Sequence, residues 1–208
     1  YGQETKKVNI RQAASFEVNE KLFPGAKILK SNAEIRVHLH HDGMDIWSDI
    51  AYFYETENSF EAEGYVVVKQ GDSLELISEY IEYSGTTKLA IAKRKVELEN
   101  NGSILRTDSL FFDRQKQEVY YQTTGEITSE DTVIRSQSGT YLVDDKKYEF
   151  ISDVVVTDPS FTIFSQRMDY YTEVRHAYFY GATTINGEGY DVYCNRGFFD
   201  SNLKKGYF

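Results

Sequence analysis

A repeat of about 29 residues constrains this chain more than any other feature of its sequence. Each copy starts with a Ser, Thr or Cys, which we call the anchor residue, and continues through a short segment rich in aromatic side chains. The copies are Ser48–Tyr54, Ser78–Ser84, Thr107–Asp113, Ser136–Leu142, Ser165–Tyr171 and Cys194–Asp200. Their anchors lie 30, 29, 29, 29 and 29 positions apart. A fixed period of this size indicates one supersecondary unit that stacks on copies of itself.

Composition and turn signals predict antiparallel strands. The chain has 17 Tyr and 13 Phe but only 2 Pro, which favours strands over helices. Each repeat has one short polar turn signal before the anchor segment, such as residues 70–73, and another after it, such as residues 85–87. Two hairpin turns per repeat leave room for two strands of about ten residues each. We therefore predict an all-β fold, an up-and-down antiparallel meander with two strands per repeat.

Apolar residues alternate along both strands of each repeat, which is typical of strands buried on one face. In the anchor strand the apolar positions change parity just after the anchor residue. A straight strand alternates strictly, so a bulge or corner is expected there in every copy. The returning strand has a small residue at four of the five equivalent positions, among them Gly64 and Gly181, which would let it bend. We predict a repeat-built sheet that folds over on itself around an apolar interior.

The inward apolar columns are the candidate binding residues. In the anchor strands these are Leu76, Ile81, Leu105, Leu110, Ile134, Ile163 and Met168. In the returning strands they are Val68, Leu98, Ile127 and Val156.

The repeat also defines the expected domain organisation, a single domain over residues 1–208. Residues 1–47 form a degraded N-terminal repeat or cap, residues 48–193 five regular repeats, and residues 194–208 a partial terminal repeat. Cys194 is the single cysteine, so it cannot form a disulfide within the chain, and it occupies an anchor position. Packing is its favoured role, and an intermolecular bridge or a reactive thiol is the alternative.

Charge and hydropathy argue against nucleic-acid binding and against a membrane-spanning helix. The net charge is −10, with acidic and basic residues interspersed, whereas nucleic-acid binding needs a basic surface. The sequence contains no run of 18 apolar residues, so no membrane-spanning helix is predicted.

Motifs for catalysis or cofactors are weak. His38 and His40 lie on the polar face of one strand and could bind a metal weakly, but an exposed polar face is the favoured interpretation. The role of these two residues and of His41 is left open. The acidic residues after the anchors, Asp49, Glu79 and Asp108, could suggest a carboxylate row for sugar cleavage, but they recur with the repeat. Hydrogen bonding at the corner is the favoured interpretation, and we predict no catalytic residue, no metal and no cofactor.

The repeat pattern Ser/Thr-Asp-x-Leu-x-Tyr/Phe-Asp, followed by a polar turn and a strand such as Ser59–Val68, resembles the OstA-like family. This family includes the periplasmic lipopolysaccharide-transport protein LptA and the N-terminal domain of its outer-membrane partner LptD. The resemblance implies a V-shaped β-jellyroll, or β-taco, whose apolar trough shields the acyl chains of lipid A. It also implies a periplasmic location in a Gram-negative bacterium, with the signal peptide removed and an association with the outer membrane. Its implied partners are lipopolysaccharide and either other jellyroll proteins of the same transport system or a second copy of the chain, joined by edge-strand stacking.

Two other functions are compatible with the sequence. The repeat could form a structural or assembly β-solenoid whose core is sealed and takes no lipid. A carbohydrate-active β-solenoid enzyme is less favoured, because no acid pair stands outside the repeat.

Overall fold

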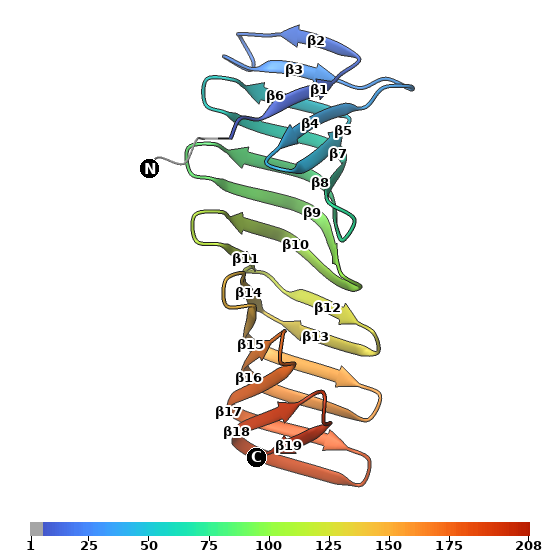
Figure 1. The fold of residues 1–208 in the computed structure, drawn as a ribbon, viewed down its shortest axis with the longest axis vertical. Helices are drawn as coiled ribbons and strands as arrows, with labels where there is room; N and C mark the ends of the chain where they lie inside the picture. The colour runs from blue at the N-terminus through green and yellow to red at the C-terminus, as the bar shows by residue number, and fades with distance from the viewer. Residues whose placement is uncertain (1–5) are drawn as a thin grey trace. The chain divides into compact units, whose positions relative to one another are not determined.

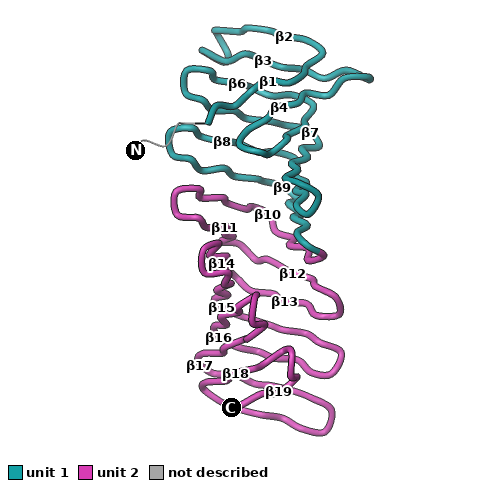
Figure 2. Tube along the Cα trace, viewed as in Figure 1, with its two compact units in different colours: residues 1–101 teal, residues 102–208 magenta. Residues whose placement is uncertain are grey.

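The computed structural model describes residues 6–208, and every regular element in this range is a β-strand (Figure 1). The chain divides into two compact units, residues 1–101 and residues 102–208 (Figure 2). The predicted all-β class is confirmed. The expectation of one domain over residues 1–208 stays a prediction.

The first unit begins with short strands and ends with three long ones. They are β1 (Asn9–Gln12), β2 (Ser15–Val18), β3 (Lys27–Lys30), β4 (Val37–His41), β5 (Met44–Ser48), β6 (Ile50–Tyr54), β7 (Ser59–Gln70), β8 (Leu74–Ser84) and β9 (Leu89–Asn100). In the second unit, the long strand β10 is followed by the short strands β11 to β14, and the short strand β19 comes last. Its strands are β10 (Ser103–Asp113), β11 (Glu118–Tyr121), β12 (Gly125–Ser129), β13 (Thr132–Ser136), β14 (Ser138–Leu142), β15 (Lys147–Asp158), β16 (Phe161–Tyr171), β17 (His176–Gly187), β18 (Tyr190–Asp200) and β19 (Lys205–Tyr207).

Consecutive strands pair as hairpins in both units. In the first unit β7 pairs with β8 and β8 with β9, and in the second unit β15 to β18 pair in chain order. All of these pairings are antiparallel. The predicted meander, with two strands per repeat, is therefore confirmed for residues 6–208.

Each repeat has its corner next to the anchor residue, as the parity change predicts. Between the pairs Glu63–Tyr80 and Val66–Ser78, two residues of β7 face one residue of β8. The same step separates Ile151–Arg167 from Val154–Ser165 in β15 and β16. The extra residue lies on the returning strand, so the anchor strand stays continuous in β8, β10, β16 and β18.

Left-handed backbone forms this corner in β7, β9, β15 and β17. Positive φ angles occur at Gly64 (75°), Tyr65 (33°), Arg94 (65°), Lys95 (52°), Ser152 (63°), Asp153 (51°) and Gly181 (78°). Outside glycine this conformation costs roughly 1–2 kcal/mol per residue. At Gly64 a side chain would also clash, because a Cβ would lie 2.5 Å from Oδ2 of Asp49. The small residues of the returning strands thus mark the bend, although Arg94 and Lys95 adopt it without being small.

The buried anchor hydroxyl stabilises the corner from the other strand. Ser48 Oγ donates to the carbonyl of Ile50 at 3.0 Å, and Ser78 Oγ to that of Tyr80 at 3.1 Å. The second unit repeats the bond from Ser136 to Ser138 (2.8 Å) and from Ser165 to Arg167 (3.1 Å). These four serines are 1–6% exposed. Each satisfies a carbonyl two residues along the strand, at the point where the face changes.

We predict that Ser78→Ala destabilises the protein by about 0.5–1.5 kcal/mol, because it removes the hydrogen bond that the buried Ser78 hydroxyl donates to the Tyr80 carbonyl. Ser73→Ala, in the exposed β7–β8 turn, is the matched control and should change stability by less than about 0.5 kcal/mol. Urea unfolding of both variants measures the difference. Equal unfolding free energies for the two variants would show that the anchor hydroxyl does not hold the corner.

Candidate functional site

The corner divides each unit into two walls that enclose an apolar interior. The first wall holds the anchor-strand residues before the corner and their paired partners, and the second wall holds those after it. Nine of the eleven predicted interior residues are at most 9% exposed, whereas Leu98 and Ile134 are half-buried. The nine are Val68, Leu76, Ile81, Leu105, Leu110, Ile127, Val156, Ile163 and Met168. Most of these side chains are thus buried in the interior, and lipid binding by them stays a prediction.

Strand register aligns these side chains into continuous rows. On the first wall of the second unit, directly paired residues form the row Leu105, Ile127, Ile134, Val156, Ile163 and Ile185. The first wall of the first unit carries Leu39, Ile46, Val68, Leu76 and Leu98 in the same way. Each row runs across the strands, along the axis of stacking within its unit. A long apolar chain would meet hydrocarbon along this whole direction.

Aromatic side chains contact each other across the interior, far from the corner. In the first unit, the His41 ring of the first wall lies 4.6 Å from the Tyr83 ring of the second wall. In the second unit, Phe161 of the first wall lies 5.4 Å from Phe199 of the second wall. These contacts join the two walls at the open side of the fold.

The N-terminal segment also connects the walls of the first unit. Lys6 forms an ion pair with Asp42 in the turn between β4 and β5. The Val8 amide donates to Asn58 Oδ1 at 2.7 Å, and Asn58 Nδ2 donates to the Lys6 carbonyl at 3.0 Å. Asn58 lies in the turn between β6 and β7, on the second wall. Val8 is only 4% exposed, so this segment covers part of the interior.

Two tyrosine hydroxyls lie inside the second unit. Burial raises the pKa of Tyr121 and of Tyr148 to about 12 in each case. Both side chains therefore remain neutral throughout the physiological pH range.

The residues after the anchors contact the bulge of the returning strand. Glu79 Oε1 lies 2.6 Å from Lys95 Nζ, and Gln137 Nε2 donates to Asp153 Oδ2 at 3.3 Å. Lys95 and Asp153 are left-handed bulge residues. These contacts support corner hydrogen bonding as the role of this repeated polar position.

His38 and His40 lie side by side on the outer face, as predicted from strand parity. Both rings bond to one oxygen of Asp45, His38 Nε2 at 2.7 Å and His40 Nδ1 at 3.0 Å, and His38 stacks on Trp47. Within residues 6–208, no group of three or more ligand-type side chains is arranged to hold a metal ion. The pair instead binds a carboxylate, whereas His41 faces the interior.

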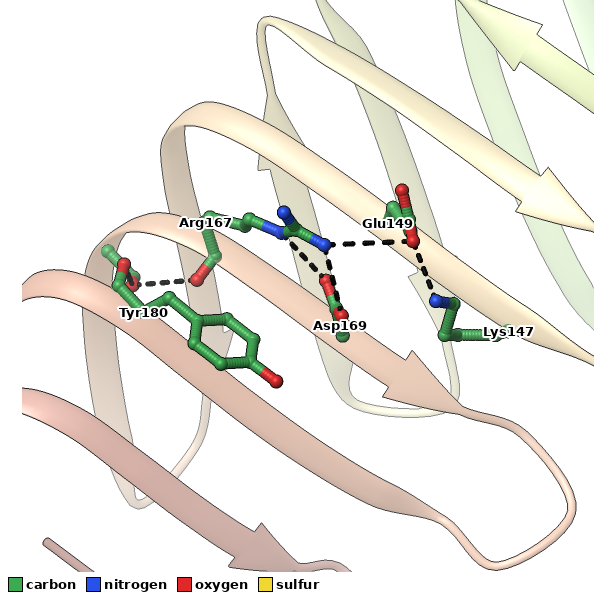
Figure 3. Close-up of polar contacts among 6 residues, drawn as sticks. Lys147, Glu149, Arg167, Asp169 and Tyr180 are labelled. Atoms are coloured by element: carbon green, nitrogen blue, oxygen red, sulfur yellow. Dashed lines mark hydrogen bonds and ion pairs between the residues drawn. The ribbon is translucent and has the colours of Figure 1, made fainter.

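A second polar network on the outer face was not predicted from the sequence (Figure 3). Arg167 forms a bidentate contact with Asp169 at 3.0 and 3.2 Å, lies 3.6 Å from Glu149, and covers the Tyr180 ring. Lys147 reaches Glu149 at 2.6 Å. The hydrogen bonds to Asp169 raise the pKa of Arg167. In the sequence, only the opposite charges at outward positions of neighbouring strands could have indicated this network. Its contacts connect β15, β16 and β17.

The contacts of Asp45 with His38 and His40 predict that the stability of the protein depends on pH. Hydrogen bonds from His40 and His38 lower the pKa of Asp45 below its ordinary value. A lowered native-state pKa contributes stability above the unfolded-state value of about 3.9, and the contribution disappears as pH falls through the native-state pKa.

We therefore expect Asp45→Asn to be less stable than the wild type at pH 7, with a difference that narrows toward pH 3. Asp72→Asn, in the exposed β7–β8 turn, is the control. Thermal unfolding between pH 3 and pH 7 measures both. A difference that stays constant down to pH 3 would contradict the assignment.

The chain is similar to one protein family and to solved structures. The model of a family described as OstA-like protein matches residues 5–166. Structures that match include the crystal structure of LptH from Pseudomonas aeruginosa, described as the LptA homologous periplasmic component of the conserved lipopolysaccharide transport device. The sequences are 17% identical, the match covers 64% of this chain and 79% of LptH, and the TM-score is 0.29. No curated protein matches the chain. Among residues 6–208, no helix is long and apolar enough to cross a membrane.

Proposed function

This chain belongs to the OstA-like family, and on that premise we propose that it is a periplasmic module of lipopolysaccharide transport. In this role it shields the acyl chains of lipid A between the two walls as the glycolipid moves toward the outer membrane. The part played by the protein is non-enzymatic, and association with the outer membrane follows from the same role. The observation that supports it is the continuous apolar row along the interior of each unit.

The driving force for such binding is apolar contact. Each buried methylene contributes about 0.8 kcal/mol, so ten methylenes contribute about 8 kcal/mol. An aromatic pair such as Phe161 and Phe199 contributes about 0.5–1.5 kcal/mol beyond its buried area. An acyl chain between the walls replaces such contacts with its own and keeps the inward side chains out of water. The net charge of −10 gives no long-range attraction to an anionic glycolipid.

The near-complete burial of the interior favours a second candidate, a structural or assembly solenoid with a sealed core. Its support is the low exposure of residues such as Leu110 (0%) and Ile163 (2%). In this second case the walls never part and no lipid enters.

Titration with lipid A at low and high salt separates the two candidates. We expect saturable binding that persists at high salt, because screening weakens only electrostatic attraction. Absence of saturable binding by the folded wild type at either salt concentration would reject the carrier role.

We also predict that Leu110→Asp loses lipid binding by at least tenfold, since it places a charge in the inward row. Ser109→Asp adds the same charge at the adjacent, outward position and should bind as the wild type does. Binding is compared only between variants whose circular dichroism spectrum and unfolding midpoint show that they are folded. Equal lipid affinity of the two variants would place the binding site elsewhere.

Edge strands supply the proposed route to protein partners. Within residues 6–208, β2 pairs with β3 on one side, and its Phe16 and Val18 are 61% and 67% exposed. An edge of this kind is a template for another strand. We propose that it stacks on a second copy of the chain or on another jellyroll protein of the transport system.

Lysine on an edge strand discourages pairing, so Phe16→Lys combined with Val18→Lys should weaken end-to-end association. Light scattering over a concentration series measures this, with Tyr65→Lys, another exposed aromatic away from β2, as the control. A wild type that stays strictly monomeric at high concentration would contradict self-stacking.

A further inference from the structure

The repeat formed by β10 to β14 departs from the neighbouring repeats at its corner. Its returning strand is interrupted between β11 and β12, whereas β7, β9, β15 and β17 each run for 12 residues. No positive φ occurs at Gln122, Thr123 or Thr124, so the corner lacks the left-handed residues of its neighbours. Its inward column carries Tyr121 where the first unit has Ala62 and Ala92 and the next two repeats have Phe150 and Phe179, so only this ring in the column has a hydroxyl.

The Tyr121 ring spans the corner from one wall to the other. Gly125 lies on the first wall, paired with Thr107 and Ser136, and Gly139 lies on the second wall, paired with Tyr121 itself. A Cβ on Gly125 would lie 2.4 Å from the ring, and one on Gly139 would lie 2.6 Å from it. The ring therefore occupies space that side chains of both walls would otherwise fill.

Other repeats show what Tyr121 replaces. The position of Gly125 is Val66, Val96, Val154 or Thr183 in other copies, and the position of Gly139 is Ala51, Ile81, Leu110, Met168 or Gly197. Only this repeat has glycine at both positions. Since both glycines lack a side chain, one tyrosine takes the place of two apolar side chains. The pairing of one large residue with two glycines indicates a specific fit of this ring to this position.

A hydrogen bond fixes the ring. Tyr121 Oη lies 2.6 Å from Oγ of Ser136, the anchor residue of this repeat, and Ser136 Oγ donates in turn to the Ser138 carbonyl at 2.8 Å. Tyr121 is 3% exposed and Ser136 is 2% exposed. A buried hydroxyl with a satisfied partner resists displacement, because breaking the bond leaves an unpaired polar group in the interior.

We propose that Tyr121 is a fixed stop at the base of the second unit's interior, which limits how far an acyl chain extends along the corner. Leu105 and Leu110 of β10 lie on one side of it along the stack, and Ile163 and Met168 of β16 lie on the other. This inference rests on the proposed lipid-binding function and names the residue that sets the accepted chain length.

The test is a binding series with saturated fatty acids of 8 to 18 carbons. While each added methylene is buried, affinity rises about fourfold per methylene. In the wild type we expect the rise to stop once the chain reaches Tyr121. In Tyr121→Ala the rise continues to longer chains, and in Tyr121→Phe, which keeps the ring, it stops at the wild-type length.

Two further variants keep the test decisive. Tyr121→Leu retains more of the packing and should shift the limit in the same direction if the alanine variant does not fold. Phe179→Ala truncates another buried ring of the second unit, two repeats along the same column, and should leave the limit unchanged.

The outcomes distinguish this inference from the function on which it rests. A wild type that binds fatty acids while the folded Tyr121 variants keep the same limit overturns the role of Tyr121 alone. A limit that shifts equally in Phe179→Ala also overturns it, because any cavity would then suffice. A folded wild type that binds no fatty acid of any length overturns both.

Discussion

The fold depends on one polar interaction, the bond from a buried anchor serine to the carbonyl two residues further along its strand, which four of the six anchors make. Thr107 instead donates to the Thr124 carbonyl of the returning strand. The bond gives the buried serine hydroxyl a partner at the point where the strand changes face. The bond accompanies the two-against-one step in the returning strand, where left-handed residues absorb the bend. Together they turn a flat meander into two walls. The apolar rows enclose an interior only because every repeat bends at the same place.

The repeat period shows how much of the fold could be predicted from the sequence. Anchor residues 29 or 30 positions apart and two turns per repeat were sufficient to predict antiparallel hairpins, and the parity change was sufficient to place the corner. Which strand carries the extra residue was not predictable in this way. Arg94 and Lys95 adopt left-handed angles against their own preference, because the register of the neighbouring strands requires it.

The sequence predicted which residues of the candidate site point inward, but not which of them contact each other across the interior. Strict alternation identified residues such as Leu76 and Leu110 as inward, and the structure buries them at 2% and 0%. The pairing of Phe161 with Phe199 depends on how closely the two walls approach each other, which alternation within a strand does not encode. The fit of Tyr121 against two glycines from different strands has the same origin. Its sequence signal was present, a tyrosine and two glycines in columns that are otherwise mostly apolar, but the signal becomes specific only when the corner brings them together.

The central claim is that an acyl chain lies between the two walls, and methyl nuclear magnetic resonance tests it most directly. A lipid with a nitroxide near the end of its acyl chain broadens the methyl signals close to it. The account predicts broadening at the inward residues Ile81, Leu110 and Ile163, with little change at the exposed methyls of Ile151, Val174 and Leu203. Broadening confined to the exposed methyls, or absent while the lipid is in excess, would contradict it.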